Sequence, residues 1–309
     1  MSHSIVLTAL DGSNPLGFMA AIGTLRLLHL DDPKHAYALR WMRHGFWMPE
    51  VVGASDRPEA LAQRLYRLTR EHLPADVFSQ FLGKNITVDN STFKTFVRKA
   101  ATETRLENRT LADFAAAFGS EICKDDRKNR IEYTDFCFIT GSGHQHFLAT
   151  MATLKESVTP EHIQDALFGN WAKQKGLSMR WDPANAAEYA LRWSDPGPEG
   201  ASSVWAANLL AAHALPLFPS QPTERGLRTT GLRTVGRSDS EFTWPIWTHS
   251  AGLDTVTSLL SMSAIQKPEK DIDHGGLSAF GIEQVYRAPR VRIGQGANFK
   301  VSFRPARAV

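Results

Sequence analysis

Apolar and polar positions near the start of the chain follow first the period of a strand and then that of a helix. Residues 4–10, SIVLTAL, are β-branched and apolar, which predicts a strand, and the DGSN that follows is typical of a turn. Over residues 16–30 the apolar side chains recur at helical spacing, with Asn14 in the N-cap position and Pro15 in the first turn. The pattern therefore predicts a strand followed by a helix.

The next segment alternates as the two strands of a hairpin do. Residues 36–53, AYALRWMRHGFWMPEVVG, place His44 and Gly45 at its bend. The opening is thus predicted to be strand–helix–strand–strand. This order predicts an α+β fold with mixed helices and a mainly antiparallel sheet.

The middle of the chain is predicted to be mostly helical, because leucine and phenylalanine recur at helical spacing between charged positions. Helices are expected over residues 57–73, 76–82, 91–104, 110–118, 145–154 and 160–168. The segment CKDDRKNRIEY, residues 123–133, is rich in charge. We interpret it as an exposed, mobile loop.

The C-terminal half is predicted to be rich in strands, since short aromatic and β-branched runs recur between turn residues. Strands are expected over residues 177–182, 188–193, 241–247, 284–293 and 298–306, and helices over residues 202–215 and 253–262. The sequence GLRTTGLRTVGR, residues 226–237, repeats Gly-Leu-Arg-Thr. Its five-residue period fits neither an amphipathic helix nor a strand, so we interpret it as a flexible basic loop.

The sequence pattern changes near residues 169–176, GNWAKQKG, from predicted helices to short aromatic strands. We therefore predict an N-terminal α+β region with a helical insertion over residues 1–172 and a C-terminal α+β region with basic strands over residues 173–309. The boundary is soft, because no long linker separates the two regions and a chain of 309 residues also suits one large domain.

Composition changes this picture little. The chain is 42% hydrophobic and 22% charged, which is ordinary for a globular protein. Cys123 and Cys137 provide no disulfide framework and no zinc-binding spacing, so both are expected to be reduced thiols. No secretory signal pattern opens the sequence, and no apolar run reaches the length of about 20 residues that crosses a bilayer. We expect a cytoplasmic protein with no membrane partner.

Charge is unevenly distributed along the chain. The formal net charge is only +3, but no acidic residue occurs from Gln284 to the C-terminus. That segment carries Arg287, Arg290, Arg292, Lys300, Arg304 and Arg307, and an earlier cluster holds Arg225, Arg228, Arg233 and Arg237. Two arginine-rich clusters favour contact with phosphates, most plainly those of nucleic acid. The alternative is a solvated basic face without a partner.

The stretch ITGSGHQHFL, residues 139–148, leads into a predicted helix. Gly141 and Gly143 suit a backbone that binds a phosphate through free N–H groups, with His144 adding a hydrogen bond. A tight turn with a purely structural role is the alternative. Joint metal binding by His144 and His146 is disfavoured, because alternate residues point to opposite sides of a helix. No metal is predicted.

Two tryptophan-rich stretches admit a structural and a functional interpretation. One stretch has Arg180, Trp181 and Asp182, followed by Arg192 and Trp193. These residues suit a hairpin whose arginines stack on the tryptophans and pair with Asp182 or Asp195, or else an acid–aromatic catalytic pair. Trp244 and Trp247 suit either the core or the stacking of unpaired bases. The structural interpretation is the more common in both cases.

Several strings together resemble a known family. They are LDGSNPLGFMAAIGTLRLL, GSGHQHFL, LSMRWDP, YALRWSDP, LPLFP, FTWPIW and NFKVSF, which cover nearly the whole chain. They resemble accessory proteins encoded in type I-G (formerly I-U) CRISPR loci, near the helicase–nuclease and large-subunit genes. The resemblance implies a cytoplasmic role in antiviral defence, within or beside a crRNA-guided DNA-binding complex. It brings no catalytic residues with it.

The leading hypothesis is a non-catalytic nucleic-acid-binding or scaffolding subunit of a CRISPR interference complex, without a cofactor. Its partners would be crRNA or target DNA together with other effector subunits or the helicase–nuclease. No Walker loop, His-Asp phosphohydrolase pair or HNH array occurs in the sequence. One alternative is a metal-dependent nuclease using His144, His146 and Asp135. Another is a protein-interaction module that recruits the helicase–nuclease through the Trp-rich second half.

Overall fold

The opening segment folds as its apolar pattern predicts. The computed structural model describes residues 3–54, 57–105, 108–125, 128–140, 145–184, 202–236, 239–293 and 300–309. Its first elements are β1 (Ser4–Val6), α1 (Pro15–Asp31), β2 (Ala38–His44) and β3 (Phe46–Val52). The Asn14 side chain accepts hydrogen bonds from the N–H groups of Leu16 and Gly17, as an N-cap does. The predicted strand–helix–strand–strand opening is confirmed.

The strands pair in antiparallel register. One sheet has the order β1-β3-β2-β12, in which β12 is Ala251–Gly252. The second sheet has the order β10 (Leu232–Val235), β11 (Asp239–Trp247), β13 (Ile282–Ile293) and β14 (Lys300–Phe303), and β15 (Arg307–Ala308) also pairs with β13. Three short pairs complete the set: β4 (Gly119–Asp125) with β5 (Arg130–Tyr133), β6 (Gln174–Lys175) with β7 (Ser202–Ser203), and β8 (Ser220–Thr223) with β9 (Gly226–Thr229).

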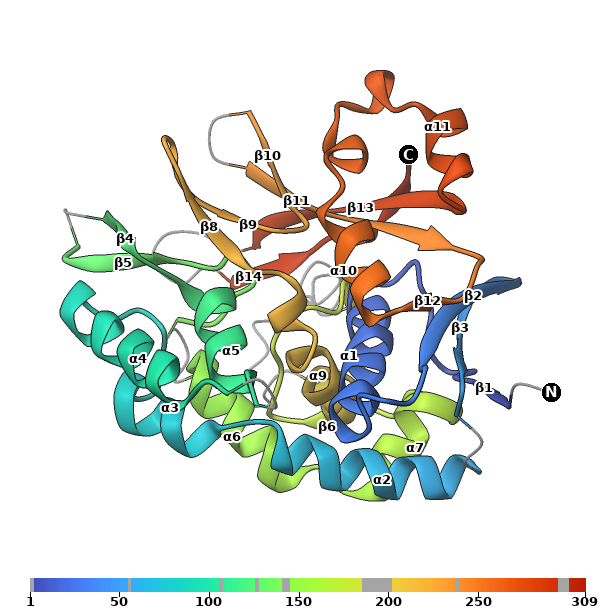
Figure 1. Cartoon of the computed structure of the whole chain (residues 1–309), viewed down its shortest axis with the longest axis horizontal. Helices are drawn as coiled ribbons and strands as arrows, with labels where there is room; N and C mark the ends of the chain where they lie inside the picture. The colour runs from blue at the N-terminus through green and yellow to red at the C-terminus, as the bar shows by residue number, and fades with distance from the viewer. Residues whose placement is uncertain are drawn as a thin grey trace, which may run out of the picture.

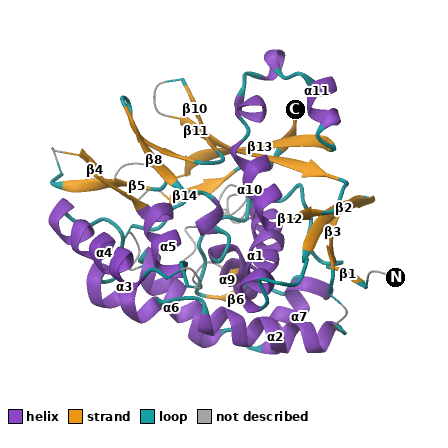
Figure 2. Cartoon of the chain, viewed as in Figure 1, coloured by secondary structure: helices purple, strands orange, loops and turns teal. Residues whose placement is uncertain are grey.

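The mostly helical middle is also confirmed. It contains α2 (Pro58–Glu71), α3 (Ala75–Leu82), α4 (Asn90–Glu103), α5 (Thr110–Phe118), α6 (Phe147–Ser157) and α7 (Pro160–Phe168). The C-terminal half adds α9 (Trp205–Ala212), α10 (Leu253–Ser261), α11 (His274–Ala279) and the 3-10 turns η2 (Leu215–Leu217), η3 (Ser263–Gln266) and η4 (Glu269–Asp271). The α+β class is therefore correct. Figures 1 and 2 show helices α2, α3, α4, α6 and α7 along one side of the molecule and β10, β11, β13 and β14 along the other.

Helix α1 lies at the centre of this arrangement. Its residues from Pro15 to Leu28 are all buried, and it packs closely on α9. Gly23 makes the close packing possible, because a Cβ at this position would lie 2.0 Å from the carbonyl oxygen of Leu210. Helix α1 has apolar residues on all sides and no polar face, which is typical of a helix at the centre of a fold.

Tryptophans join the two sheets across α1. Phe18 of α1 packs against Trp41, Trp244 and Trp247 with ring centroids 5.5–6.3 Å apart. The indole N–H of Trp244 donates to the carbonyl of Gly12 at 2.8 Å, and both β11 tryptophans are fully buried. Their structural interpretation is thus confirmed. One hydrophobic cluster consequently includes residues from both sides of position 172.

The prediction that residues 123–133 form a mobile loop is wrong. Residues 119–133 form the β4–β5 hairpin, apart from positions 126 and 127, which lie outside the described residues. Charge misled the prediction because the hairpin projects from the molecule (Figure 1), and none of its described charged side chains is buried.

The prediction of a flexible basic loop over the Gly-Leu-Arg-Thr repeat is also wrong. Its first Gly-Leu-Arg-Thr unit is β9. In its second unit Gly231 ends the turn and the next three residues lie in β10, and the two strands belong to different sheets. Gly226 and Gly231 have φ of 106° and 79°, values that favour glycine over other residues. The five-residue period therefore reflects a glycine turn followed by a short strand, repeated once.

The aromatic strands predicted over residues 177–182 and 188–193 are not confirmed. Residues 177–182 form no strand, because Arg180 has a φ of 64° and Trp181 points into the core, where its N–H donates to the carbonyl of Phe136 at 3.0 Å. Residues 188–193 lie outside the described part of the chain.

The predicted pairing of Arg180 with Asp182 is wrong. The guanidinium of Arg180 donates to the side chain of Gln145 at 3.0 Å, and Asp182 accepts hydrogen bonds from Asn14 and from the N–H of Ala184. The other residues of this interpretation, Arg192, Trp193 and Asp195, lie outside the described residues.

Candidate nucleic-acid interface

The acid-free C-terminal strand carries its arginines on two faces. Side chains alternate along β13, so Arg290 and Arg292 share one face and Arg287 lies on the other. Arg290 stands opposite Ser240 of β11 and Phe303 of β14 in the sheet. The predicted cluster is thereby divided.

Arg290 and Arg292 border a first cavity, which we call the hairpin cleft. It has a volume of about 310 Å³ between the β4–β5 hairpin, β9 and β13. Its lining consists of Asp125, Lys128, Arg130, Ile131, Glu132, Tyr133, Asp135, Leu227, Thr229, Arg290 and Arg292. Sequence reasoning missed Lys128, Arg130 and Tyr133, because they lie in the segment whose charge is typical of a loop.

Part of the charge in the hairpin cleft is compensated internally. Arg290 lies 4.0 Å from Asp135 and over the ring of Phe138, and Lys128 lies 3.3 Å from Asp125. Both pairs lie at a partly exposed surface, where ion pairs contribute little to stability. The cleft therefore combines basic side chains with several carboxylates.

The other acidic and aromatic groups of the hairpin cleft have structural partners. Glu132 accepts a hydrogen bond from the N–H of Leu227 at 2.5 Å, which fixes β9 against the hairpin. Burial raises the pKa of Tyr133, so its phenol is neutral at pH 7. A neutral half-buried ring at a cleft wall suits stacking or packing rather than acid–base chemistry.

The same two arginines also border a second cavity, which we call the strand-end cleft. It has a volume of about 510 Å³ and is lined by Val235, Asp239, Ser240, Glu241, Pro289, Arg290, Val291, Arg292 and Arg304. Arg304 is exposed, and its N–H donates to the carbonyl of Pro289 at 2.9 Å. The structure thus brings together Arg290, Arg292 and Arg304, which are distributed over 15 positions of the sequence.

The earlier arginine cluster lies on neighbouring strands. Arg228 and Arg233 line a third cavity of about 300 Å³ beside α10, but Arg233 is ion-paired with Glu241 at 3.0 Å. Arg225 is exposed between β8 and β9. Arg237 lies outside the described residues.

Arg287 was predicted to contact phosphate, and the structure contradicts this. Its side chain is 0% exposed, and Nη2 donates to the carbonyls of Ile265 at 3.0 Å and Lys267 at 2.5 Å. Burial, followed by the charge of Arg233, lowers its pKa. Arg287 therefore holds the η3 segment against the sheet. The acid-free sequence of this segment gave no sign that strand alternation would bury one of its arginines.

Lys300 begins β14 opposite Ile293 and is partly buried. Burial, together with the nearby charge of Arg180, lowers its pKa. Lys300 is consequently separate in environment from the exposed arginines of the two clefts. Arg307, at the same end of the chain, is ion-paired with Glu269 at 2.5 Å.

The glycine-rich candidates Gly141, Gly143 and His144 lie outside the described residues, but their flanks are defined. Thr140 and His146 form an antiparallel bridge, and α6 begins at Phe147. The N–H groups of Leu148 and Ala149 both donate to the carbonyl of Lys84, at 3.1 and 3.2 Å. These first-turn groups are occupied, so the helix start does not offer them to a phosphate as predicted.

The residues considered for a metal have other contacts. Asp135 lies beside Arg290, and the backbone of His146 forms a bridge with that of Thr140. Within the described ranges, no group of three or more histidine, cysteine, aspartate or glutamate side chains is arranged to hold a metal ion. His144 lies outside the described residues, so this statement does not cover it.

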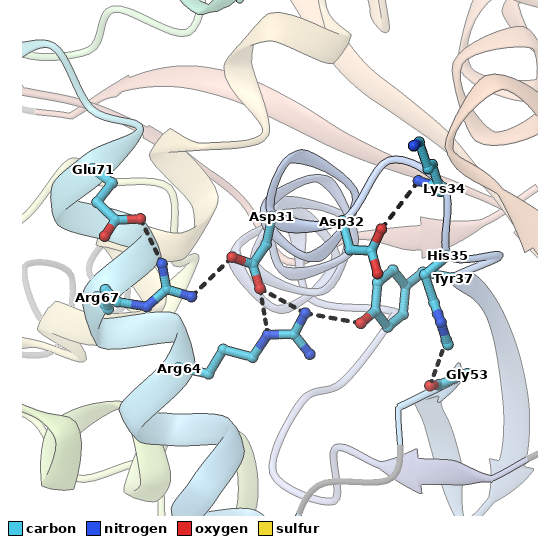
Figure 3. A network of polar contacts seen from close by, with 9 residues as sticks. All are labelled: Asp31, Asp32, Lys34, His35, Tyr37, Gly53, Arg64, Arg67 and Glu71. Carbon is cyan, nitrogen blue, oxygen red and sulfur yellow. Dashed lines mark hydrogen bonds and ion pairs between the residues drawn. The ribbon is translucent and has the colours of Figure 1, made fainter. Parts of the chain in front are cut away.

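The arginines of α2 are committed to a structural network (Figure 3). Asp31, at the end of α1, accepts hydrogen bonds from Arg64 at 2.7 Å and Arg67 at 2.8 Å. Arg67 also donates to Glu71, and Arg64 donates to the hydroxyl of Tyr37. Burial by itself raises the pKa of Asp31, but the hydrogen bonds from Arg67 and Arg64 outweigh it and hold the pKa below its usual value. These arginines therefore fasten α2 to α1.

Comparison of the chain with protein-family models and with curated protein sequences finds no match. Among the described residues, no helix combines the length and the apolar character that crossing a membrane requires.

Proposed function

We propose that this protein is a non-catalytic nucleic-acid-binding or scaffolding subunit of a crRNA-guided interference complex, of the kind encoded in the type I-G CRISPR loci that its sequence resembles. It acts in the cytoplasm in antiviral defence. Its nucleic-acid partner is crRNA or target DNA, and its protein partners are other effector subunits or the helicase–nuclease.

One observation carries the nucleic-acid part of the proposal: Arg290 and Arg292 border both the hairpin cleft and the strand-end cleft. Arg130 also borders the hairpin cleft and Arg304 also borders the strand-end cleft, so the two clefts together hold four arginines. Guanidinium groups bind phosphates through paired hydrogen bonds, and such contacts position a strand without reading its bases. The proposed interface accordingly binds the backbone.

Binding of short RNA, single-stranded DNA and duplex DNA, each in two unrelated sequences, tests this. The Arg290→Ala/Arg292→Ala variant is expected to weaken binding to both sequences of a type by about the same factor. Arg43→Ala/Arg57→Ala is the matched control, since both residues are exposed arginines on other elements. Equal affinity of the cleft variant and wild type would exclude the two clefts.

The scaffolding alternative has one observation of its own. Ile122 of the β4–β5 hairpin is 72% exposed, which is unusual for a large apolar side chain. Co-purification of effector subunits that is abolished in Ile122→Asp, with nucleic-acid binding unchanged, would favour it. Loss of binding only in the arginine variant would favour the nucleic-acid role.

A further inference from the structure

The third cavity, beside α10, is lined by a side-chain amide without hydrogen-bond partners. This amide belongs to Gln266 of η3, and the cavity has a volume of about 300 Å³. The Oε1 and Nε2 atoms of Gln266 are both buried, and neither has a hydrogen-bond partner among the described residues. Buried polar groups are normally paired, because leaving one unpaired is costly. The amide is therefore an unused donor beside an unused acceptor.

Asn208 shows the more usual arrangement of a buried amide. It is fully buried in α9, accepts a hydrogen bond from the N–H of Met179 at 3.0 Å and donates to the carbonyl of Val204 at 2.9 Å. These bonds join two segments of the chain, so the amide of Asn208 has a structural role. The amide of Gln266 makes no such connection among the described residues.

The backbone on either side of Gln266 is fixed. Arg287 donates to the carbonyl of Ile265 at 3.0 Å and to that of Lys267 at 2.5 Å, and the side chain of Ile265 is fully buried. The terminal torsion of a glutamine side chain is soft, so the amide turns on this fixed backbone at little cost. A ligand in the cavity supplies the hydrogen bonds that the amide lacks.

The rest of the third cavity combines apolar walls with polar groups. Leu232 and Leu260 are buried and line it, and Thr230 and Ser261 add hydroxyls. The exposed side chain of Arg228 adds a guanidinium. Ligand sites are mostly apolar, with a few polar groups that fix orientation. A volume of about 300 Å³ is at the lower end for such sites, so the cavity suits a single small ring system.

The third cavity adjoins both clefts of the proposed interface. Along β9, Leu227 and Thr229 line the hairpin cleft, whereas Arg228 between them lines the third cavity. On β10, Arg233 lines the third cavity and is ion-paired at 3.0 Å with Glu241, which lines the strand-end cleft. A nucleic-acid strand at either cleft therefore lies next to the third cavity.

We propose that the third cavity binds one unpaired adenine base, which the Gln266 amide recognises, while Arg228 contacts the adjoining phosphate. Adenine presents its N6 amine, a donor, beside N7, an acceptor, and a glutamine amide pairs with both at once. Guanine presents two acceptors at the same edge, so it leaves the amide oxygen unpaired. As a site for a base of a bound strand, it rests on the proposed function and adds base recognition to backbone binding. A free adenine nucleotide presents the same chemistry, and the experiment separates the two sources.

Binding of short single-stranded DNAs of equal length, made only of adenine, cytosine or thymine nucleotides, tests the site at one salt concentration. Wild type is expected to bind the adenine strand about tenfold more tightly than the other two, the discrimination typical of one paired base contact. Gln266→Leu should reduce this ratio to about one and leave binding of the thymine strand unchanged. Gln80→Leu, which changes an exposed glutamine of α3, is the matched control and should keep the ratio. Arg228→Gln should weaken all three strands about equally, because it removes a phosphate contact.

The thermal unfolding midpoint of Gln266→Leu separates base recognition from a structural role. The substitution replaces an unpaired buried amide with an apolar side chain of similar size, so the midpoint is expected to be unchanged or raised. Gln266→Met keeps the unbranched shape without the amide and provides a second folded variant, with the same expected loss of adenine preference. A lowered midpoint in both variants, with weaker binding of all three strands, would assign Gln266 a structural role and overturn the site.

Titration with adenosine monophosphate identifies the source of the base. Adenine preference among strands that depends on Gln266 identifies a base of a bound strand. Binding of adenosine monophosphate that is lost in Gln266→Leu, without binding of any strand, identifies a free nucleotide and contradicts only the proposed function. Equal affinity for the three strands without binding of the mononucleotide, or adenine preference that persists in both Gln266 variants, would overturn the site. Arg290→Ala/Arg292→Ala should weaken all strands by the same factor and keep the preference, so failure of the clefts and failure of this site give different results.

Discussion

At the scale of single residues, the contrast among arginines explains much of the molecule. Exposure separates Arg292 and Arg304, which line clefts, from Arg287, which is completely buried under η3. Arginine is suited to both situations because its guanidinium is planar, always charged and weakly hydrated. The residue type alone therefore does not predict a surface contact.

Substitution of Arg287 is expected to destabilise the fold. Arg287→Ala leaves the carbonyls of Ile265 and Lys267 without their donor and creates a cavity, a loss of about 2–4 kcal/mol in the free energy of unfolding. Arg292→Ala on the same strand removes an exposed side chain and should change it by less than about 0.5 kcal/mol. Urea denaturation measures both, and equal stability of the two variants would contradict the structural role of Arg287.

His213 makes stability depend on pH. It is fully buried in α9's C-cap, neither ring nitrogen has a side-chain hydrogen-bond partner, and burial followed by the charges of Arg26 and His72 holds its pKa well below 6.5. A histidine whose pKa is lowered on folding binds its proton more readily in the unfolded chain. Stability is therefore highest above about pH 6.5 and falls as the pH decreases below that value.

Below pH 6.5, this one group is expected to decrease the free energy of unfolding by up to about 1.4 kcal/mol for each pH unit. His213→Leu removes it, so the variant should lose less stability than wild type between neutral and mildly acidic pH. Lys155 and His72 also face this region, and the pKa of His72 is lowered too, chiefly by burial. His72→Gln measures that second contribution. Parallel stability curves for wild type and His213→Leu would contradict the assignment.

At the scale of elements, the contact between α1 and α9 leaves no room for a side chain at Gly23. Gly23→Ala places a Cβ against the carbonyl of Leu210, and overpacking of this kind costs about 1–3 kcal/mol. Gly275→Ala in α11 is the control, since its Cβ would meet only the Asp273 side chain at 3.5 Å. Thermal unfolding should show a lowered midpoint for the first and little change for the second. The reverse order would place the critical helix contact elsewhere.

Elements with strong local signals were predictable. The bounds of α5 and α7 agree with the predicted ranges because apolar periodicity is clear in both and α7 has a Thr159 cap followed by a proline. The β4–β5 hairpin and the strands β9 and β10 were not recognised. Their pairing partners lie elsewhere in the chain or across a charged turn, and local pattern carries no information about them.

The candidate site was predictable only in part, for the same reason. Residue counting found Arg290, Arg292 and Arg304, but strand alternation decides which side chains share a face. Arg130 and Lys128 reach the hairpin cleft through tertiary packing of a segment remote in sequence. The lack of a hydrogen-bond partner for the Gln266 amide among the described residues is likewise a property of its three-dimensional surroundings.

At the scale of the whole molecule, the predicted regions 1–172 and 173–309 share their packing. β12 of the C-terminal half pairs with β2 of the N-terminal half, and α9 packs on α1. The charged features lie outside this common core. They are the clefts beside the β4–β5 hairpin and β13, and the α1–α2 network at the end of α1 (Figure 3). Both predicted regions thus contribute to the core that carries the two clefts.

The salt dependence of duplex DNA binding tests the role of the two clefts most directly. If Arg290 and Arg292 each neutralise a phosphate, the slope of log K against log salt concentration should become shallower in Arg290→Ala/Arg292→Ala. The expected change is about 0.9 for each phosphate that the variant no longer neutralises. Arg43→Ala/Arg57→Ala should keep the slope of the wild type. A slope that is the same in wild type and in the cleft variant would contradict phosphate binding at the two clefts.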